Sequence, residues 1–317
     1  MLLTLVRHGE STANVAATWQ GQGDSPLSPT GRGQVERLGI RLSGRSFDRI
    51  LSSDLSRASD TAGALGRPVS LDQRWREIHV GTWEGLTRQE TVERYPEQVD
   101  AMSRGATDVK IGGGESWEDV RSRAELAVSE LVSSVDANAH VLVVSHGGTI
   151  SVLIASLLRL GTGSGSARPA RGLGRITNTG CTTLRLSPGR AELVSFNDTA
   201  HLEGNNGFLR ERLLGGVGAI GLVARGDDNA PWPERLLRLD NDGTAESAFE
   251  IVRKASGTLF GTVLEPQAIA DLVTARLAAP HSVAVPAPGS VTHVTLASEQ
   301  IVIADFASET RATQTER

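Results

Sequence analysis

Short apolar runs that end in polar, glycine-containing turns recur along the amino-terminal part of the chain. Residues 1–6 are nearly all apolar, and the runs 50–51 and 141–144 repeat the pattern. Uninterrupted apolar runs are typical of strands buried on both faces of a parallel sheet. Helix-like segments follow these runs. The alternation predicts an α/β domain with a mostly parallel central sheet and helices on both faces.

Amphipathic periodicity marks the helices expected to cover this sheet. The Ser28–Pro29 pair supplies an N-cap and a first-turn proline for one helix. A longer helix is predicted over residues 117–135, where apolar residues recur at steps of three and four. Ser53 or Asp54 is the expected N-cap of a third helix, which places Arg57 in its first turn.

Composition indicates a globular protein with a sizeable core. The chain has 317 residues, of which 39% are hydrophobic, and a formal net charge of −5. This length accommodates a large and a small domain, and we expect them at residues 1–205 and 206–317. The negative net charge argues against nucleic acid as a partner.

The chain lacks the signals of export. Its single cysteine, Cys181, excludes an intrachain disulfide, and it lies in a segment predicted to be a buried strand. The first residues carry no basic region or cleavage site of a signal peptide, and no apolar run reaches membrane length. We therefore expect a cytoplasmic protein with no membrane partner.

Basic side chains follow three of the predicted strands. Arg7 and His8 follow the first strand, Arg57 follows the second, and His146 comes directly after residues 141–145. In open α/β sheets ligands bind outside the carboxyl ends of the strands, so we expect these side chains to gather at one edge. A cationic pocket that contains an imidazole is suited to bind a phosphoryl group and to accept it on a ring nitrogen.

The segment 76–85 supplies a candidate acid. Glu77 is the candidate for protonating the departing oxygen of a phosphate ester, and Glu84 is the reserve. The negative charge of a bound phosphate favours the protonated carboxyl that this role requires. His79 in the same segment is expected to be a loop histidine without a catalytic role.

Six ordered segments resemble the histidine phosphatase superfamily, also called the phosphoglycerate mutase-like family. They are residues 5–14, 20–31, 52–62, 76–85, 113–116 and 145–148. The resemblance extends over about residues 1–205. It implies the phosphoglycerate mutase-like fold and hydrolysis of a phosphate ester without a metal or a cofactor.

The resemblance also implies a role for individual residues. His8 would be the nucleophile that becomes phosphohistidine, and Glu77 the proton donor that later activates water. The residues expected to bind the phosphoryl group or the rest of the substrate are Arg7, Arg57, His146, Asn14, Gln20, Arg88 and Gly147. Positive neighbours are expected to keep His8 neutral, as attack requires.

Two departures from the mutase pattern favour a phosphatase. Residues 12–14 lack the tryptophan that phosphoglycerate mutases usually carry, and the stretch from Gly85 to Gly114 lacks their arginine- and proline-rich segment. The expected substrate is a small phosphorylated metabolite, either a sugar phosphate or a phosphoglycerate-type ester. A mutase and a regulatory protein that binds phosphorylated ligands stay open as alternatives. A serine esterase lacks support because the chain has no G-x-S-x-G turn.

The resemblance ends near residue 206, and a small α+β region is predicted beyond it. A G-x-G-x-x-G match at 216–221 lacks the preceding strand of a dinucleotide site. Strands are expected at 258–264, 282–285, 291–297 and 300–306, and helices at 245–255 and 266–278. The stretch 161–174 is expected to be a mobile loop, with a substrate lid as the alternative.

One internal similarity offers an account of the second region. Residues 144–158 can be laid over residues 263–277, which aligns His146 with Glu265. The hypothesis is a degenerate half-repeat of the catalytic domain that has lost its histidine. Chance similarity between two strand-helix units is the competing interpretation. Packing on the first domain, shaping of the substrate pocket and association into a homodimer are alternative roles for the region.

Overall fold

The structure is a computed structural model in which the chain divides into two compact units. The described residues are 1–160, 173–202, 218–224, 237–238, 259–264, 266–277, 283–286, 291–297 and 300–303. The first unit comprises Met1–Ala170, Ile176–Gly180 and Arg185–Ala191, and the second comprises Arg171–Arg175, Cys181–Leu184 and Glu192–Arg317. The predicted boundary between residues 205 and 206 stays a prediction.

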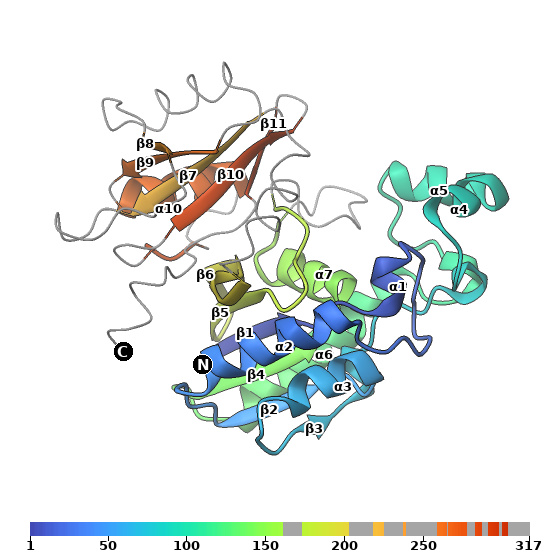
Figure 1. The fold of residues 1–317 in the computed structure, drawn as a ribbon, viewed down its shortest axis with the longest axis horizontal. Coiled ribbons are helices and arrows are strands. Elements are labelled where there is room, and N and C mark those ends of the chain that lie inside the picture. Colours follow the sequence, from blue (N-terminus) through green and yellow to red (C-terminus); the bar gives the residue numbers. More distant parts are fainter. Residues whose placement is uncertain are drawn as a thin grey trace. The chain divides into compact units, whose positions relative to one another are not determined.

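A six-stranded sheet carries the phosphatase-like segments (Figure 1). Its strands are β1 (Leu2–Arg7), β2 (Arg49–Ser52), β3 (Ser70–Leu71), β4 (His140–Ser145), β5 (Cys181–Ser187) and β6 (Arg190–Asp198). Their order is β3-β2-β4-β1-β5-β6, and β4 pairs in parallel with both β1 and β2. The predicted mostly parallel sheet is confirmed. The interior residues of β1 and β4 are buried, as their apolar composition requires.

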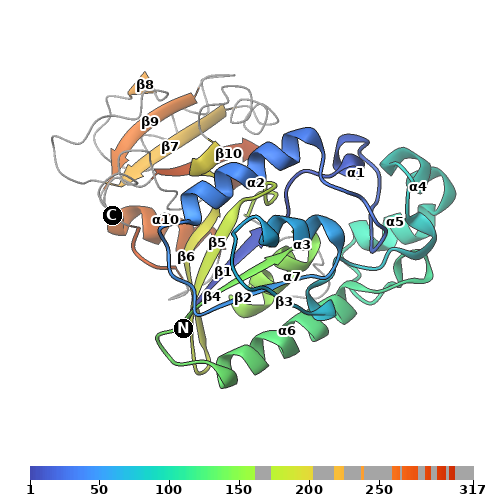
Figure 2. The same cartoon turned by 60° about the horizontal axis from the view of Figure 1, so that its bottom comes forward.

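Helices cover both faces of this sheet, with α2 and α3 on one side and α6 and α7 on the other (Figure 2). The helices of this part are α1 (Thr12–Val15), α2 (Pro29–Leu42), α3 (Ser56–Gly63), α4 (Arg88–Arg94), α5 (Pro96–Ser103), α6 (Trp117–Ser134) and α7 (Gly147–Leu157). Short 3₁₀ turns lie at Gln73–Trp75, Gly81–Trp83, Ile111–Gly113 and Ala200–Leu202.

The helix starts confirm one capping prediction and correct another. The Ser28 hydroxyl accepts the N–H of Gly31 at 2.9 Å and caps α2. Neither Ser53 nor Asp54 caps α3, because that helix begins at Ser56 with Leu55 as its N-cap. The Ser53 hydroxyl is instead engaged with a histidine ring, described below. Arg57 lies in the first turn of α3, as predicted.

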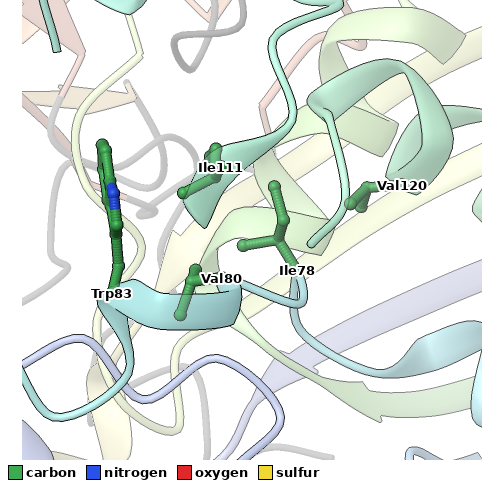
Figure 3. Packing of buried hydrophobic residues seen from close by; sticks show 5 residues of the cluster. All are labelled: Ile78, Val80, Trp83, Ile111 and Val120. Atoms are coloured by element: carbon green, nitrogen blue, oxygen red, sulfur yellow. The ribbon is translucent and has the colours of Figure 1, made fainter. Parts of the chain in front are cut away.

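An apolar cluster anchors the segment 76–85. Ile78, Val80 and Trp83 from this segment pack with Ile111 and Val120, and each is at most 2% exposed. Figure 3 shows these five side chains gathered between the segment and the residues that precede and begin α6. The cluster therefore gives a loop-like segment the rigidity that a catalytic carboxylate needs.

Truncation inside this cluster is expected to destabilise the protein. Ile111 is fully buried, so Ile111→Ala removes packed methyl groups and is expected to cost about 2–5 kcal/mol of unfolding free energy. Chemical denaturation followed by tryptophan fluorescence measures the loss, since Trp83 belongs to the cluster. Leu126→Ala on α6 is the matched control, because Leu126 is 54% exposed. Equal losses in both variants would contradict the assignment of this core.

A second, five-stranded sheet is formed by the carboxyl-terminal region (Figure 1). Its strands are β7 (Gly218–Ala224), β8 (Leu237–Arg238), β9 (Leu259–Leu264), β10 (Val291–Ala297) and β11 (Gln300–Ile303). The order is β11-β10-β7-β9-β8, and helix α10 (Pro266–Leu277) follows β9. β9 is parallel to β7 and β8, whereas β10 is antiparallel to β7 and β11.

Several predictions for this region can be compared with the described residues. The strands near 258–264 and 291–297 and the helix near 266–278 are confirmed, and 300–303 of the last strand are present. Residues 283–285 of the predicted strand 282–285 do not form a strand, because Val283 makes an isolated bridge with Leu193. Residues 218–221 of the glycine motif lie in a strand, and this excludes a phosphate-binding loop at these residues. The predicted helix 245–255 and residues 161–172 of the predicted loop lie outside the described residues.

Candidate active site

The ends of three parallel strands place the candidate residues at one edge of the first sheet. Arg7 ends β1 and pairs with Ser145, which ends β4. His8 follows directly, and its backbone N–H donates to the Ser145 carbonyl at 3.0 Å. Because parallel strands share a direction, His8 and His146 leave the sheet side by side, and their ring centroids are 5.1 Å apart.

His8 is buried and held in one orientation. His8 is only 3% exposed, and its Nδ1 is 2.6 Å from the Gly9 carbonyl oxygen. A carbonyl only accepts, so Nδ1 carries the proton and Nε2 keeps its lone pair. Burial lowers the pKa of His8 well below its usual value, and the charges of Arg7 and Arg57 lower it further. The ring is thus a neutral imidazole with a nucleophilic nitrogen.

His146 is the second buried imidazole. It is fully buried, and Nε2 lies 2.9 Å from the Ser53 hydroxyl. Nδ1 has no hydrogen-bond partner among the described residues. Burial is the largest cause that lowers the pKa of His146 well below its usual value, and the charge of Arg57 lowers this pKa further. An unsatisfied ring nitrogen beside the ring of His8 is suited to hydrogen bond with a phosphoryl oxygen.

Arg57 brings a fully buried guanidinium to the pocket. Its Nη1 and Nη2 each donate at 2.9 Å, to the carbonyls of Gly23 and Gly21, and Nε has no partner among the described residues. Burial lowers the pKa of Arg57, whereas the charge of Glu77 is the largest influence that raises it. The group remains a cation at neutral pH.

Arg7 is the second cation of the pocket. Its Nη1 donates to the Ile176 carbonyl at 2.7 Å. A Cβ on Gly147 would lie 3.3 Å from Arg7 Nε, so the first turn of α7 passes directly over the guanidinium. The start of α7 thereby adds backbone N–H groups beside the two arginines.

The Glu77 carboxylate reaches the same helix start. Its Oε2 accepts the N–H of Gly148 and its Oε1 accepts the N–H of Ile78, both at 3.0 Å. A Cβ on Gly148 would lie 2.5 Å from Glu77 Oε1, so any larger residue at this position would displace the carboxylate. Glu77 is therefore held at the start of α7, directly after His146.

Asn14 and Gln20 both form hydrogen bonds with Ser11, three residues after His8. Asn14 Oδ1 accepts from Ser11 N–H at 3.2 Å and from Asn178 Nδ2 at 3.1 Å. Gln20 Oε1 accepts the hydroxyl of Ser11 at 2.8 Å. Both side chains thus belong to the segment that continues from the nucleophile, and their roles toward substrate stay predictions.

Arg88 and Glu84 are the remaining candidates, and the Glu84 carboxylate lies beside Gly23, whose carbonyl accepts from Arg57. Arg88 begins α4 and is exposed, and no contact between it and the two histidines is found among the described residues. Its assignment to substrate binding stays a prediction. Glu84, the reserve acid, and His79 are exposed.

Two functional neighbours were not assigned from the sequence. Asn178 donates to the His8 carbonyl at 3.0 Å as well as to Asn14. Ser53 contacts the His146 ring, although the sequence suggested only a capping role for it. Both come from segments far from the histidines that they contact. Their signal in the sequence was weak because serine and asparagine are common in any loop.

The protonation of His8 gives a prediction that can be measured in the free enzyme. NMR titration of its imidazole is expected to place the midpoint below pH 6.5, because burial and two cations oppose the charged ring. Arg57→Met removes one of those cations and is expected to raise the pKa of His8. Arg121→Met is the control, since Arg121 is a half-exposed residue of α6 paired with Glu118. A His8 midpoint at or above pH 6.5 in the unaltered protein would contradict the geometry.

Fold and site together define an enzyme of phosphoryl transfer: a neutral imidazole, two guanidinium groups and a carboxylate meet at the edge of an α/β sheet. Residues 3–199 match the histidine phosphatase superfamily (branch 1), and the chain belongs to this family. It is a phosphoric monoester hydrolase. Among the described residues, no helix is long and apolar enough to cross a membrane.

Curated relatives carry the same assignment. The chain is 40% identical over 175 residues to a glucosyl-3-phosphoglycerate phosphatase of Mycolicibacterium vanbaalenii, covering 50% of this chain and 74% of the relative. It is 34% identical over 215 residues to a metal-independent phosphoserine phosphatase of Arabidopsis thaliana, covering 66% and 85%.

A solved structure is similar as well. It is a mycobacterial glucosyl-3-phosphoglycerate phosphatase in complex with VO3, at 38% identity and a TM-score of 0.55. The alignment covers 61% of this chain and 96% of that chain.

Proposed function

We propose that this phosphatase hydrolyses a small phosphate monoester through a phosphohistidine on His8 Nε2. The observation that carries the proposal is the Nδ1 hydrogen bond to Gly9, which leaves Nε2 unprotonated within a buried cationic pocket. A neutral nitrogen nucleophile and fixed positive charge are the two requirements for attack on a phosphate dianion.

In the first step, Nε2 attacks phosphorus opposite the ester oxygen. The N–P bond forms as the P–O bond to the leaving group breaks, and the Glu77 carboxyl transfers its proton to the departing oxygen. Arg7, Arg57 and Nδ1–H of His146 bind the equatorial oxygens. The alcohol leaves, and Glu77 is then a carboxylate.

In the second step, Glu77 accepts a proton from water while the water oxygen attacks phosphorus. The N–P bond breaks, inorganic phosphate forms, and His8 regains its lone pair. This sequence uses only groups of the chain, so no metal or cofactor is required. Ser53 supports it as a donor to Nε2 of His146, which leaves the proton on Nδ1 for the phosphoryl oxygen.

The substrate class follows from the relatives. Glucosyl-3-phosphoglycerate and phosphoserine, the substrates in the names of two relatives, are both small anionic esters of an aliphatic alcohol. We propose a substrate of this class. A cytoplasmic location, the lack of nucleic-acid and membrane partners, and a homodimer stay predictions.

A panel of phosphorylated metabolites assayed for phosphate release in the presence of EDTA tests the proposal. We expect release from at least one aliphatic monoester with EDTA present. Isomer formation from a phosphoglycerate without release would favour the mutase alternative. Tight binding without turnover of any ester would favour the regulatory alternative.

A further inference from the structure

A largely buried ion pair contacts the backbone of the segment that carries Glu77. Arg123 on α6 donates from Nε and Nη2 to the two oxygens of Glu115, at 2.9 and 3.1 Å. The two side chains are only 17% and 23% exposed. Two parallel, charge-assisted hydrogen bonds fix the relative orientation of both groups. Glu115 belongs to the family-like segment 113–116, and the proposed reaction leaves it without a role.

Three further hydrogen bonds of this pair go to the main chain around Glu77. Arg123 Nη2 donates to the Glu77 carbonyl at 3.1 Å, and Nη1 donates to the Arg74 carbonyl at 2.7 Å. Glu115 Oε2 accepts the N–H of His79 at 2.9 Å. The pair therefore binds the backbone of Glu77 itself and of residues on both sides of it in the chain.

Gln22 completes this arrangement. Its amide nitrogen donates to the Glu77 carbonyl at 3.2 Å and lies 3.5 Å from Glu115 Oε2. The Glu77 backbone is thus fixed from one side by α6 and from the other by the segment after α1, while its carboxylate is held by Gly148.

We infer that Glu115 and Arg123 are positioning residues that aim the Glu77 carboxyl at the leaving-group oxygen. The inference rests on the proposed function and deepens it. Neither residue touches His8, so neither is expected to act on the nucleophile. A displacement of about 1 Å in a proton donor can cost about 10²-fold in rate, so loosening this grip has a measurable effect.

Leaving-group dependence distinguishes positioning from general structure. Glu115→Gln and Arg123→Lys are expected to lower kcat/KM about 10- to 100-fold for an alkyl phosphate. This ratio reports phosphoryl transfer to His8 and not the later hydrolysis, which needs Glu77 for every ester. For an aryl phosphate whose phenolate leaves without a proton, kcat/KM is expected to fall less than about threefold, since proton donation contributes little there. Combined with Glu77→Gln, neither substitution is expected to cause a further loss.

Matched controls come from a second ion pair on the same helix. Glu118→Gln and Arg121→Lys alter a half-exposed pair of α6 and are expected to leave both activities unchanged. Thermal melting identifies a variant that has lost its fold. Gln22→Ala, which removes one bond to the Glu77 carbonyl, then provides the same test with a smaller expected loss.

Equal losses for the two leaving groups in a folded variant, or losses that add to that of Glu77→Gln, would overturn the inference. Failure of the proposed function is a different result: Glu77→Gln itself would then show no dependence on the leaving group. The two failures are therefore distinguishable in one set of assays.

A second inference comes independently from the carboxyl-terminal sheet, which repeats the strand order of the first. From one side the order is β8-β9-β7-β10-β11, and the corresponding strands of the first sheet are β2-β4-β1-β5-β6. β9 is parallel to both of its neighbours, as β4 is to β2 and β1. A helix follows each of these strands directly, α7 after β4 and α10 after β9.

The lengths of the strands agree with the same correspondence. β4 and β9 have six residues each, and β5 and β10 have seven residues each. With one offset for each strand, the pairing of neighbouring residues can be matched as well. The pair Arg7–Ser145 corresponds to the pair Ala224–Leu264. In the same way, Arg49–Val141 corresponds to Leu237–Phe260, and Met1–Leu186 corresponds to Gly218–Leu296. β5 and β10 also share a buried threonine at their second position, Thr182 and Thr292.

Arg7, His8 and His146 are not retained in the corresponding positions of the sequence. Ala224 stands in the place of Arg7, Arg225 in the place of His8, and Glu265 in the place of His146. The connection from β7 to β9 comprises residues 225–258 and is much shorter than that from β1 to β4, which comprises residues 8–139.

We propose that this sheet is a second copy of the phosphatase sheet, produced by internal duplication and stripped of its catalytic residues. It extends the half-repeat hypothesis, because β7 and β8 correspond to β1 and β2 as well. The chain then has one phosphoryl-accepting site. Shared strand order alone is weak support, since few topologies are common. The matched strand directions, the equal lengths of β4 and β9 and of β5 and β10, and the buried threonine pair add to it.

An experimental structure of the full chain and a labelling experiment test this proposal. The two sheets are expected to superpose strand for strand with the pairs above in register, and a shift of one residue or a different strand order would overturn the duplication. Phosphohistidine formed from a ³²P-labelled ester is trapped under alkaline conditions. The label is expected on His8 and is expected to be absent from His8→Asn. Label on residues 206–317 of that variant would overturn catalytic silence.

Discussion

Replacement of His8 by asparagine is expected to lower kcat at least about 10⁴-fold for every ester, because the phosphoryl group loses its acceptor. His8 is 3% exposed and its Nδ1 is bonded to the Gly9 carbonyl, which leaves Nε2 as the only nitrogen that can attack. Asparagine keeps a polar side chain of smaller volume but offers no basic nitrogen. Phosphate release with a sensitive continuous assay measures the loss.

Binding and fold provide the controls for this variant. His8→Asn is expected to melt near the temperature of the unaltered protein and still to bind inorganic phosphate, since Arg7, Arg57 and His146 remain. His79→Asn alters an exposed histidine and is expected to retain activity. Substantial turnover by folded His8→Asn would refute the assignment of the nucleophile.

Substitution of Glu77 by glutamine is expected to lower kcat about 10²- to 10⁴-fold for alkyl phosphates, the range that general acid catalysis contributes. The amide occupies the same volume but supplies no acidic proton to the leaving oxygen. For an aryl phosphate with an acidic phenol the first step needs little protonation, so its loss of kcat/KM, which reports that step and not the later hydrolysis, is expected to be much smaller. A plot of log kcat/KM against the pKa of the leaving group is therefore expected to become steeper.

The reserve candidate supplies the comparison. Glu84 is exposed and comes from the same segment as Glu77, so Glu84→Gln changes charge equally at a different place. It is expected to leave the slope of that plot unchanged. A steeper slope in Glu84→Gln than in Glu77→Gln would transfer the role of acid to Glu84.

Sequence pattern and structure agree most closely where local chemistry decides the outcome. Apolar runs 1–6 and 141–144 form β1 and β4, and Ser28 caps α2, because strand burial and capping depend on residues close in sequence. The expectation for Ser53 or Asp54 as a cap failed for a tertiary reason. The Ser53 hydroxyl is used by His146, a residue from another strand, and the helix begins after it.

The family, the sheet and the order of catalytic segments could be determined from the sequence alone, since each is encoded in short stretches whose strand ends must meet at one sheet edge. Only the tertiary structure decided which ring nitrogen of His8 is free, that Asn178 holds its backbone, and that Glu115 and Arg123 grip the backbone of Glu77. These features join residues far apart in the chain, through hydrogen bonds whose direction no local pattern encodes.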